Sequence, residues 1–334
     1  MWMTEIVADF GTDHWWQLDG YFNGGTAPWL TKGDESWSIN APSTAASDEQ
    51  LLPFALDDAL PDFPDWKARG TQAYTGLNRT DPDAIWSFQG WAFVNWKTQQ
   101  QASSLKSFVD ATPKGKFNVI DMSVNGDGEW KMWNNASFWG AKFVWTTLHD
   151  FGGTDGMKGW LSRINQIPFG TPEGSGVWGT GFTPEGIDQN PVYYEFMADV
   201  NWREAPVDDI PAHISLRSHR RYGLNDGLNA HVDSAWRNLV ASSYAQDLSV
   251  QDGTGVAHIG SNEAWAWHQD RYTPSDMLCM VWRAWGDLNA AAANAVSPSN
   301  EPFRYDLINL GREVLSQMAG PVGQNFSDTI QDNT

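Results

Sequence analysis

The residues in this sequence best suited to chemistry are carboxylates that directly follow short apolar runs. Glu185 stands between Pro184 and Gly186, just past the apolar run at 177–182. A carboxyl group at the end of a strand is typical of glycosidases, in which two such groups flank the scissile bond. Position and neighbours leave two interpretations of Glu185 equally open. It is either a nucleophile or an acid that stabilises the amino end of a following helix.

Polar and aromatic side chains follow the other apolar runs as well. They are Asp19 and Asn23 after the first run, Trp91 after the second, Asp121 at the third, and His149 with Asp150 after the fourth. The chain also contains 21 Trp, and although most single indoles belong to cores, flat rings of this kind also stack on sugars. This excess favours a carbohydrate ligand over a nucleotide.

Metal and cofactor sites are not predicted. His14 and His149 have no second His or Cys at ligand spacing, so a hydrogen-bonded histidine near a strand is the better interpretation of each. The glycine pairs at 24–25 and 152–153 lack the residues of a phosphate-binding loop. We therefore expect no metal and no cofactor.

The elements that must position these residues alternate between strand and helix in the first part of the chain. Strands are predicted at 5–10, 84–88, 117–122, 143–148 and 177–182. Helices are predicted between them at 66–77, 98–111, 156–166 and 189–202. This order indicates an α/β fold, a (β/α)8 TIM-type barrel of which about five strands are present.

The period changes after Pro206. Four helical segments follow with no strand between them, at 210–222, 231–246, 274–295 and 303–318. We therefore expect two domains: a partial barrel over 1–206 and an incomplete α-helical domain over 207–334.

Composition excludes several classes of function. The 334 residues include 21 Lys and Arg against 41 Asp and Glu, a net charge of −20, which repels nucleic acids and anionic membranes. The single cysteine, Cys279, excludes an internal disulfide framework. No apolar stretch is long enough to span a membrane, and residues 1–10 have no signal-peptide pattern.

Long motifs in a fixed order resemble the α-N-acetylglucosaminidases of glycoside hydrolase family 89. The motifs are FGTDH from Phe10, DPDAIWSFQGW ending at Trp91, FVWTTLHDFGG from Phe143, GTGFTPEGIDQNPVYYEFMADVNWR from Gly179, HRRYG from His219 and FRYDLINL from Phe303. The resemblance implies a barrel followed by a helical domain, with this chain starting at about the fourth barrel strand and ending inside the helical domain. It also implies a glycan partner with terminal α-linked N-acetylglucosamine, such as heparan sulfate, and a lysosomal or secreted location. The oligomeric state is left open.

The family is retaining, so the resemblance implies two catalytic carboxyl groups. Glu185 matches the nucleophile, but the acid/base position is occupied by Asn23, or by Gly24 if the alignment shifts by one, and neither has a carboxyl group. A displaced acid is an open alternative, supplied by Asp19, Asp34 or Glu35. The residues that the resemblance assigns to substrate binding are Asp19, Phe22, Trp91, Trp145 and His149.

The missing carboxyl group at the acid/base position leaves three interpretations open. The chain is a hydrolase with a weak acid step, a sugar-binding homologue that has lost catalysis, or a fragment with no function of its own. A neutral glycan suits the net charge better than a polyanionic one, although a basic patch around Arg217, Arg220 and Arg221 would offset this.

Overall fold

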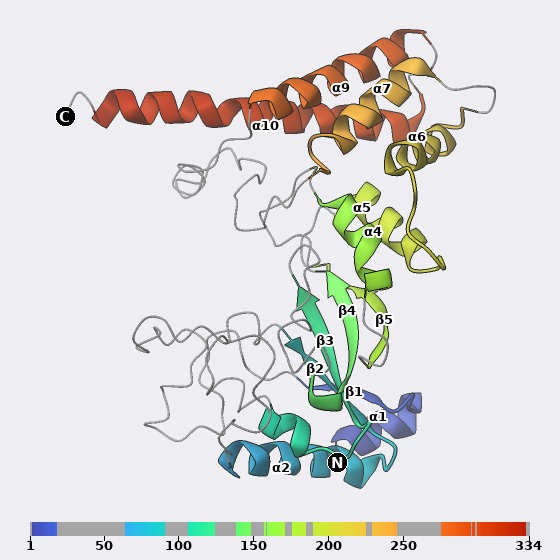
Figure 1. The fold of residues 1–334 in the computed structure, drawn as a ribbon, viewed down its shortest axis with the longest axis vertical. Helices are drawn as coiled ribbons and strands as arrows, with labels where there is room; N and C mark the ends of the chain where they lie inside the picture. Colours follow the sequence, from blue (N-terminus) through green and yellow to red (C-terminus); the bar gives the residue numbers. More distant parts are fainter. Residues whose placement is uncertain are drawn as a thin grey trace. The chain divides into compact units, whose positions relative to one another are not determined.

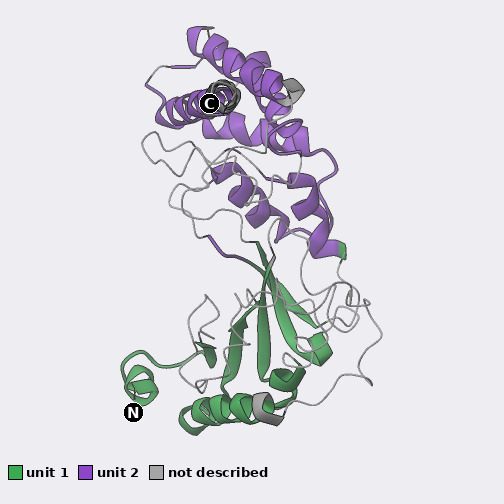
Figure 2. Ribbon diagram, turned by 90° about the vertical axis from the view of Figure 1, so that its left-hand side faces the viewer, with its two compact units in different colours: residues 1–123, 127–147, 170–181 green, residues 124–126, 148–169, 182–334 purple. Residues whose placement is uncertain are grey.

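The computed structural model of the chain divides into two compact units, which are coloured separately in Figure 2. Unit 1 comprises residues 1–123, 127–147 and 170–181, and unit 2 comprises 124–126, 148–169 and 182–334. The structure describes residues 2–18, 64–90, 106–123, 138–147, 157, 159–170, 176–184, 190–224, 229–245, 275–294, 296–297 and 299–331. Among the described helices, none combines the length and the apolar character needed to cross a lipid bilayer.

Unit 1 is built on a five-stranded sheet with the strands in sequence order, β1-β2-β3-β4-β5 (Figure 1). The strands are β1 (Trp15–Leu18), β2 (Ile85–Gln89), β3 (Phe117–Ser123), β4 (Lys142–Thr147) and β5 (Val177–Phe182). The first four pair in parallel, with Trp16 opposite Trp86 and Val119 opposite Phe143. Parallel neighbours joined by crossovers in sequence order are the arrangement of a (β/α)8 barrel, which confirms the predicted fold class.

Aromatic rings fill the space beside the sheet. The edge of the Trp86 ring meets Phe117 and Phe108, with ring centroids 5.1 and 5.9 Å apart. Phe88 joins the same cluster, and all four side chains are at most 5% exposed. These four rings belong to the core, as expected for most aromatic residues of the chain.

The predicted strand at 5–10 is wrong, because this segment is helix α1 (Trp2–Phe10). Met3, Ile6 and Val7 are its half-buried residues, and their spacing places them on one helical face. Gly11 ends the helix at φ 75°, and its N–H donates to the Val7 carbonyl at 2.9 Å. The first strand therefore starts at Trp15. Thr12, Asp13 and His14, expected to follow a strand, instead precede one.

Helices occupy most of the other predicted positions. Unit 1 contains α2 (Pro64–Thr80). Unit 2 contains α4 (Leu161–Gly170), α5 (Pro191–Val200), α6 (Ile210–Arg221), α7 (Ala230–Val240), α9 (Ser275–Asn294) and α10 (Glu301–Gln331). The last residue of α4 is assigned to unit 1. Three bounds differ clearly from the prediction: α4 begins at Leu161 instead of 156, α7 ends at Val240 instead of 246, and α10 continues to Gln331 instead of ending at 318. Of the predicted helix at 98–111, only 106–111 falls in the described part of the chain, and 106–110 is helical.

Buried Asp81 holds the segment between α1 and β1 in place. Its carboxylate accepts hydrogen bonds from the Trp16 indole (2.9 Å), the Thr12 hydroxyl (3.0 Å) and His14 Nδ1 (2.8 Å). Burial raises the pKa of Asp81, but the bonds from these three side chains and from the Asp83 backbone outweigh it, and the pKa falls to about 2. The FGTDH motif thus has a structural role, because Thr12 and His14 bind the Asp81 carboxylate. His14 is a hydrogen-bonded histidine just before β1.

Gly90 lies where β2 comes closest to the backbone of β3. A Cβ at this position would lie 2.6 Å from the Ile120 carbonyl oxygen and 3.4 Å from the Asp121 Cα. Backbone atoms of a central strand cannot move aside cheaply. The glycine of the DPDAIWSFQGW motif is therefore required by this close approach.

Replacing Asp81 by Asn should lower the free energy of unfolding by about 2–3 kcal/mol at pH 7, because an amide cannot accept all these bonds as a carboxylate does. The folded pKa lies below the ordinary 3.8, so the unfolded chain binds more protons at acid pH. The carboxylate's contribution is complete above about pH 4 and is lost as the pH falls towards 2.

Urea denaturation of the variant and the parent between pH 7 and pH 3 measures this difference. Asp83→Asn is the matched control, because that side chain is 74% exposed. Equal stability of Asp81→Asn and the parent at pH 7 would contradict this structural role of the Asp81 carboxylate.

Replacing Gly90 by Ala should destabilise the chain by about 1–3 kcal/mol, since the added methyl group overlaps the Ile120 carbonyl. Gly76→Ala is a control that should raise the stability of the chain. No atom lies within 4 Å of the added carbon there, and alanine favours the interior of α2 by about 0.5–1 kcal/mol. Thermal unfolding of both variants tests the pair, and a Gly90→Ala variant that melts with the parent would disprove the close approach.

Candidate functional site

The candidate active site is the edge of the sheet at which the parallel strands end. Because β1 to β4 run in one direction, their last residues, Leu18, Gln89, Ser123 and Thr147, lie at the same end of the sheet. Most residues predicted for the site belong to the segments that follow these strands or β5. Asp19, Phe22, Asn23, Trp91, His149 and Glu185 all lie outside the described residues.

Trp145 is the one predicted site residue that the structure describes. It lies on β4 opposite Asp121 of β3, and the Thr146 hydroxyl donates to the Asp121 carbonyl at 2.9 Å. Trp145 and Asp121 are each 1% exposed. The Trp145 ring is thus packed into the sheet, while its buried indole N–H has no hydrogen-bond partner among the described residues. Its role in binding substrate stays a prediction.

The strand that leads to Glu185 is packed closely against β4. A Cβ at Gly181 would lie 3.3 Å from the Thr146 methyl group and 3.7 Å from a Val144 methyl group, which is tight but not forbidden. Beyond the end of β5 at Phe182 the chain is described as far as Pro184, the residue before Glu185.

The helix after this segment begins with a well-anchored turn. Asn190 caps α5, Pro191 is its first residue, and the Asn190 side chain accepts a hydrogen bond from Tyr244 at 3.1 Å. Tyr244 is fully buried, and this burial raises the pKa of its hydroxyl, which therefore stays protonated. The bond to Tyr244 therefore holds Asn190 at the start of α5.

Two of the matched motifs meet at one buried carboxylate. Asp306 of FRYDLINL accepts two hydrogen bonds from Arg221 (2.8 and 3.1 Å) and one from Tyr222 (2.8 Å), both of HRRYG. Trp236 of α7 donates to the Tyr222 hydroxyl at 3.2 Å. Burial, together with the charge of Asp306, raises the pKa of Tyr222. Burial lowers the pKa of Arg221, but Asp306 outweighs this and raises it. The network joins α6, α7 and α10, so it has a structural role.

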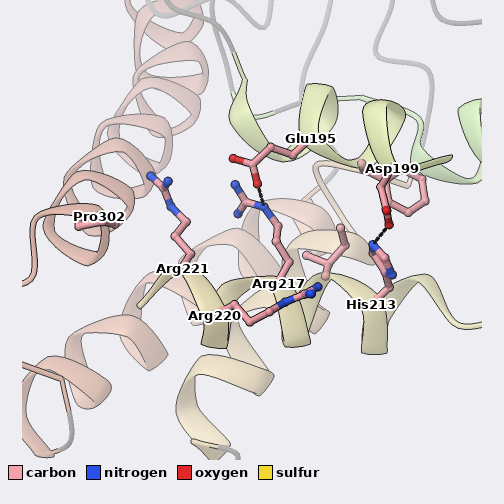
Figure 3. A pocket seen from close by; sticks show the side chains of 9 residues that line it. Glu195, Asp199, His213, Arg217, Arg220, Arg221 and Pro302 are labelled. Atoms are coloured by element: carbon pink, nitrogen blue, oxygen red, sulfur yellow. Dashed lines mark hydrogen bonds and ion pairs between the residues drawn. The ribbon is translucent and has the colours of Figure 1, made fainter. Parts of the chain in front are cut away.

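Unit 2 also contains a pocket of about 480 Å³ between α5, α6 and the start of α10 (Figure 3). Its lining residues are Glu195, Phe196, Asp199, His213, Ile214, Arg217, Arg220, Arg221 and Pro302. No residue predicted for catalysis or sugar binding lines it. The basic patch expected from the sequence does line it, but Arg217 pairs with Glu195 at 2.5 Å and Arg221 with Asp306.

Sequence reasoning missed the acidic residues that line this pocket, of which Glu195 pairs with Arg217 and Asp199 with His213. Glu195 and Asp199 are four residues apart on α5, which places them on one helical face, and that spacing was the available signal. The helix that they meet, α6, was predicted, but its packing against α5 was not visible in the sequence. Within the described part of the chain, no group of three or more acidic, histidine or cysteine side chains is arranged to hold a metal ion.

Comparisons with known proteins agree with this fold. Residues 53–204 match the family model described as the α-N-acetylglucosaminidase (NAGLU) tim-barrel domain, and residues 214–334 match the NAGLU C-terminal domain. Human α-N-acetylglucosaminidase is 29% identical over 332 residues, which cover 95% of this chain and 37% of the human protein. The chain therefore spans a little over a third of that relative.

Solved structures of a family 89 glycoside hydrolase from Clostridium perfringens share the fold. The complex with 2-acetamido-1,2-dideoxynojirmycin has a TM-score of 0.60 at 20% identity, covering 80% of this chain and 28% of the other. A form with two Glu-to-Gln substitutions, in complex with its substrate GlcNAc-α-1,4-galactose, has a TM-score of 0.61 at 18% identity, covering 80% and 29%. Two consecutive NAGLU family models match most of the chain, and its sheet has the strand order of a barrel. This chain therefore belongs to the α-N-acetylglucosaminidase family.

Proposed function

We propose that this chain is the later part of a retaining α-glycosidase that removes terminal α-linked N-acetylglucosamine. The observation that carries the proposal is the parallel sheet of a NAGLU-type barrel, from whose last described strand the chain leads to the TPEG segment containing Glu185. Residues 1–206 form the barrel part of this proposal and 207–334 the helical domain. The human relative's name and the Clostridium perfringens substrate complex support N-acetylglucosamine as the sugar.

Glu185 is the proposed nucleophile. In retaining glycosidases the two carboxyl groups stand about 5–5.5 Å apart, and the nucleophile forms a covalent glycosyl-enzyme. Trp91, Trp145, His149, Asp19 and Phe22 are the proposed sugar-binding residues. The chemistry requires carboxyl groups and no cofactor. Heparan sulfate as the natural substrate and a lysosomal or secreted location are proposals from the family resemblance alone.

The amide at Asn23 affects both steps of this reaction. The acid/base residue first protonates the leaving oxygen and then deprotonates the attacking water. A substrate with a good leaving group removes the first requirement but not the second. The proposed hydrolase therefore reacts quickly once with an activated aryl substrate and then turns over slowly. A sugar-binding homologue with no catalysis is the second candidate, favoured by the same residue.

Mixing the folded chain with an aryl α-N-acetylglucosaminide that has a good leaving group should release a burst of about one equivalent of the phenol. Glu185→Gln should abolish the burst and lower the rate by about 10³-fold or more, because no covalent intermediate forms. Glu204→Gln, at an exposed glutamate of the same chain, is the control. A chain that melts cooperatively but shows no burst would favour the sugar-binding homologue.

Restoring a carboxyl group through Asn23→Glu should raise steady-state turnover by about 10²–10⁴-fold, the usual contribution of an acid/base residue. Azide, an anionic nucleophile that needs no base, should accelerate the parent chain and leave Asn23→Glu unchanged. Asn23→Gln controls for side-chain length without adding a carboxyl group. Turnover that is equal in all three chains would exclude position 23 as the acid/base site and favour a displaced acid.

A further inference from the structure

Three arginines line the pocket beside α6, and two of them pair with a carboxylate, Arg217 with Glu195 and Arg221 with Asp306. Arg217, Arg220 and Arg221 all project from α6 into its lining, against Glu195 and Asp199 from α5. The chain has a net charge of −20, and three guanidinium groups nevertheless line this one pocket. All of these residues belong to unit 2.

The carboxylates leave specific donors of these arginines unused. Glu195 takes the Nε of Arg217, while the Arg217 Nη2 is buried with no hydrogen-bond partner among the described residues. Arg217 is only 9% exposed, so bulk water does not solvate this donor. A buried cationic donor left unpaired costs about 1–3 kcal/mol or more, which a bound acceptor would recover.

Arg220 is the arginine of this lining that has no carboxylate partner among the described residues. Its exposed side chain makes no hydrogen bond or ion pair with any residue in the described ranges, and Figure 3 shows it extending along the pocket towards His213. Burial lowers the pKa of His213, Asp199 opposes this from 3.0 Å, and the charges of Arg203 and Arg220 lower the pKa further. His213 therefore experiences the positive potential of Arg220 directly.

Figure 3 shows the guanidinium groups of Arg217 and Arg221 at the same end of the pocket, beside the Glu195 carboxylate. Arg221 is held there by its two bonds to Asp306, so its position is fixed without a ligand. Guanidinium groups held at one end of a pocket are suited to a tetrahedral oxyanion, because its oxygen atoms accept several charge-assisted bonds at once.

We infer that this pocket binds an oxyanion of the phosphate or sulfate type, held by Arg217, Arg220 and Arg221. The volume of about 480 Å³ exceeds that of a free ion and lies within the range of small-molecule sites, about 300–1,000 Å³. The pocket therefore has room for the ion alone or for a monoester of a sugar. None of its lining residues is assigned to glycoside hydrolysis, so the inference is independent of the proposed function.

Isothermal titration calorimetry of the full chain with inorganic phosphate, in a low-chloride buffer, tests this site. Saturable binding is expected, and Arg220→Ala should weaken it about 10–100-fold, the contribution of one or more charge-assisted hydrogen bonds. Arg283→Ala removes an exposed arginine from α9, outside the pocket, and should leave the affinity unchanged. Glu195→Gln removes a carboxylate that competes for Arg217, and should strengthen binding.

Titration with sulfate, glucose 6-phosphate and glucose distinguishes the sources of the oxyanion. Tighter binding of glucose 6-phosphate than of phosphate would assign the site to a monoester, and equal affinities would assign it to the free ion. Binding of glucose alone would contradict an oxyanion site. Absence of saturable phosphate binding, or an Arg220→Ala variant with the affinity of the parent, would overturn the inference.

Discussion

The parallel register of the sheet is the constraint on which the candidate site depends. Parallel strands in sequence order deliver every strand-to-helix connection to one edge, so residues far apart in the chain share a single surface. Gly90 allows the chain at the end of β2 to lie against the backbone of β3, and the Asp81 carboxylate, which precedes β2, accepts a hydrogen bond from the Trp16 indole of β1.

The second constraint is electrostatic and belongs to the helices. Asp306 connects the HRRYG and FRYDLINL motifs by bonding Arg221 and Tyr222, so the length of these motifs reflects packing in the helical domain. Buried charges require such partners, and removing one would leave the other uncompensated. Sequence similarity in these motifs therefore supports the fold more directly than it supports catalysis.

Much of the sheet was predictable because buried parallel strands appear as short apolar runs, and the strands from β2 to β4 follow this pattern, whereas β5 is half-buried or exposed along its length. The segment 2–10 was not, since a short apolar run is ambiguous between strand and helix. Its terminator was visible in the sequence as Gly11, the residue type that ends helices. The pocket beside α6 escaped prediction because its acidic and basic faces come from two helices whose packing no local pattern encodes.

The family assignment and the chemistry depend on different parts of the chain. Packing within the two units defines the fold, and it tolerates wide divergence as long as volume and patterning are kept. Retaining hydrolysis depends on two carboxyl groups, and in the proposed assignment one of the two positions is Asn23, an amide. A chain can therefore keep every structural motif of a glycosidase while losing the proton transfers at one position. For this protein, membership of the family determines the architecture, whereas the proposed role of position 23 in hydrolysis depends on a single side chain.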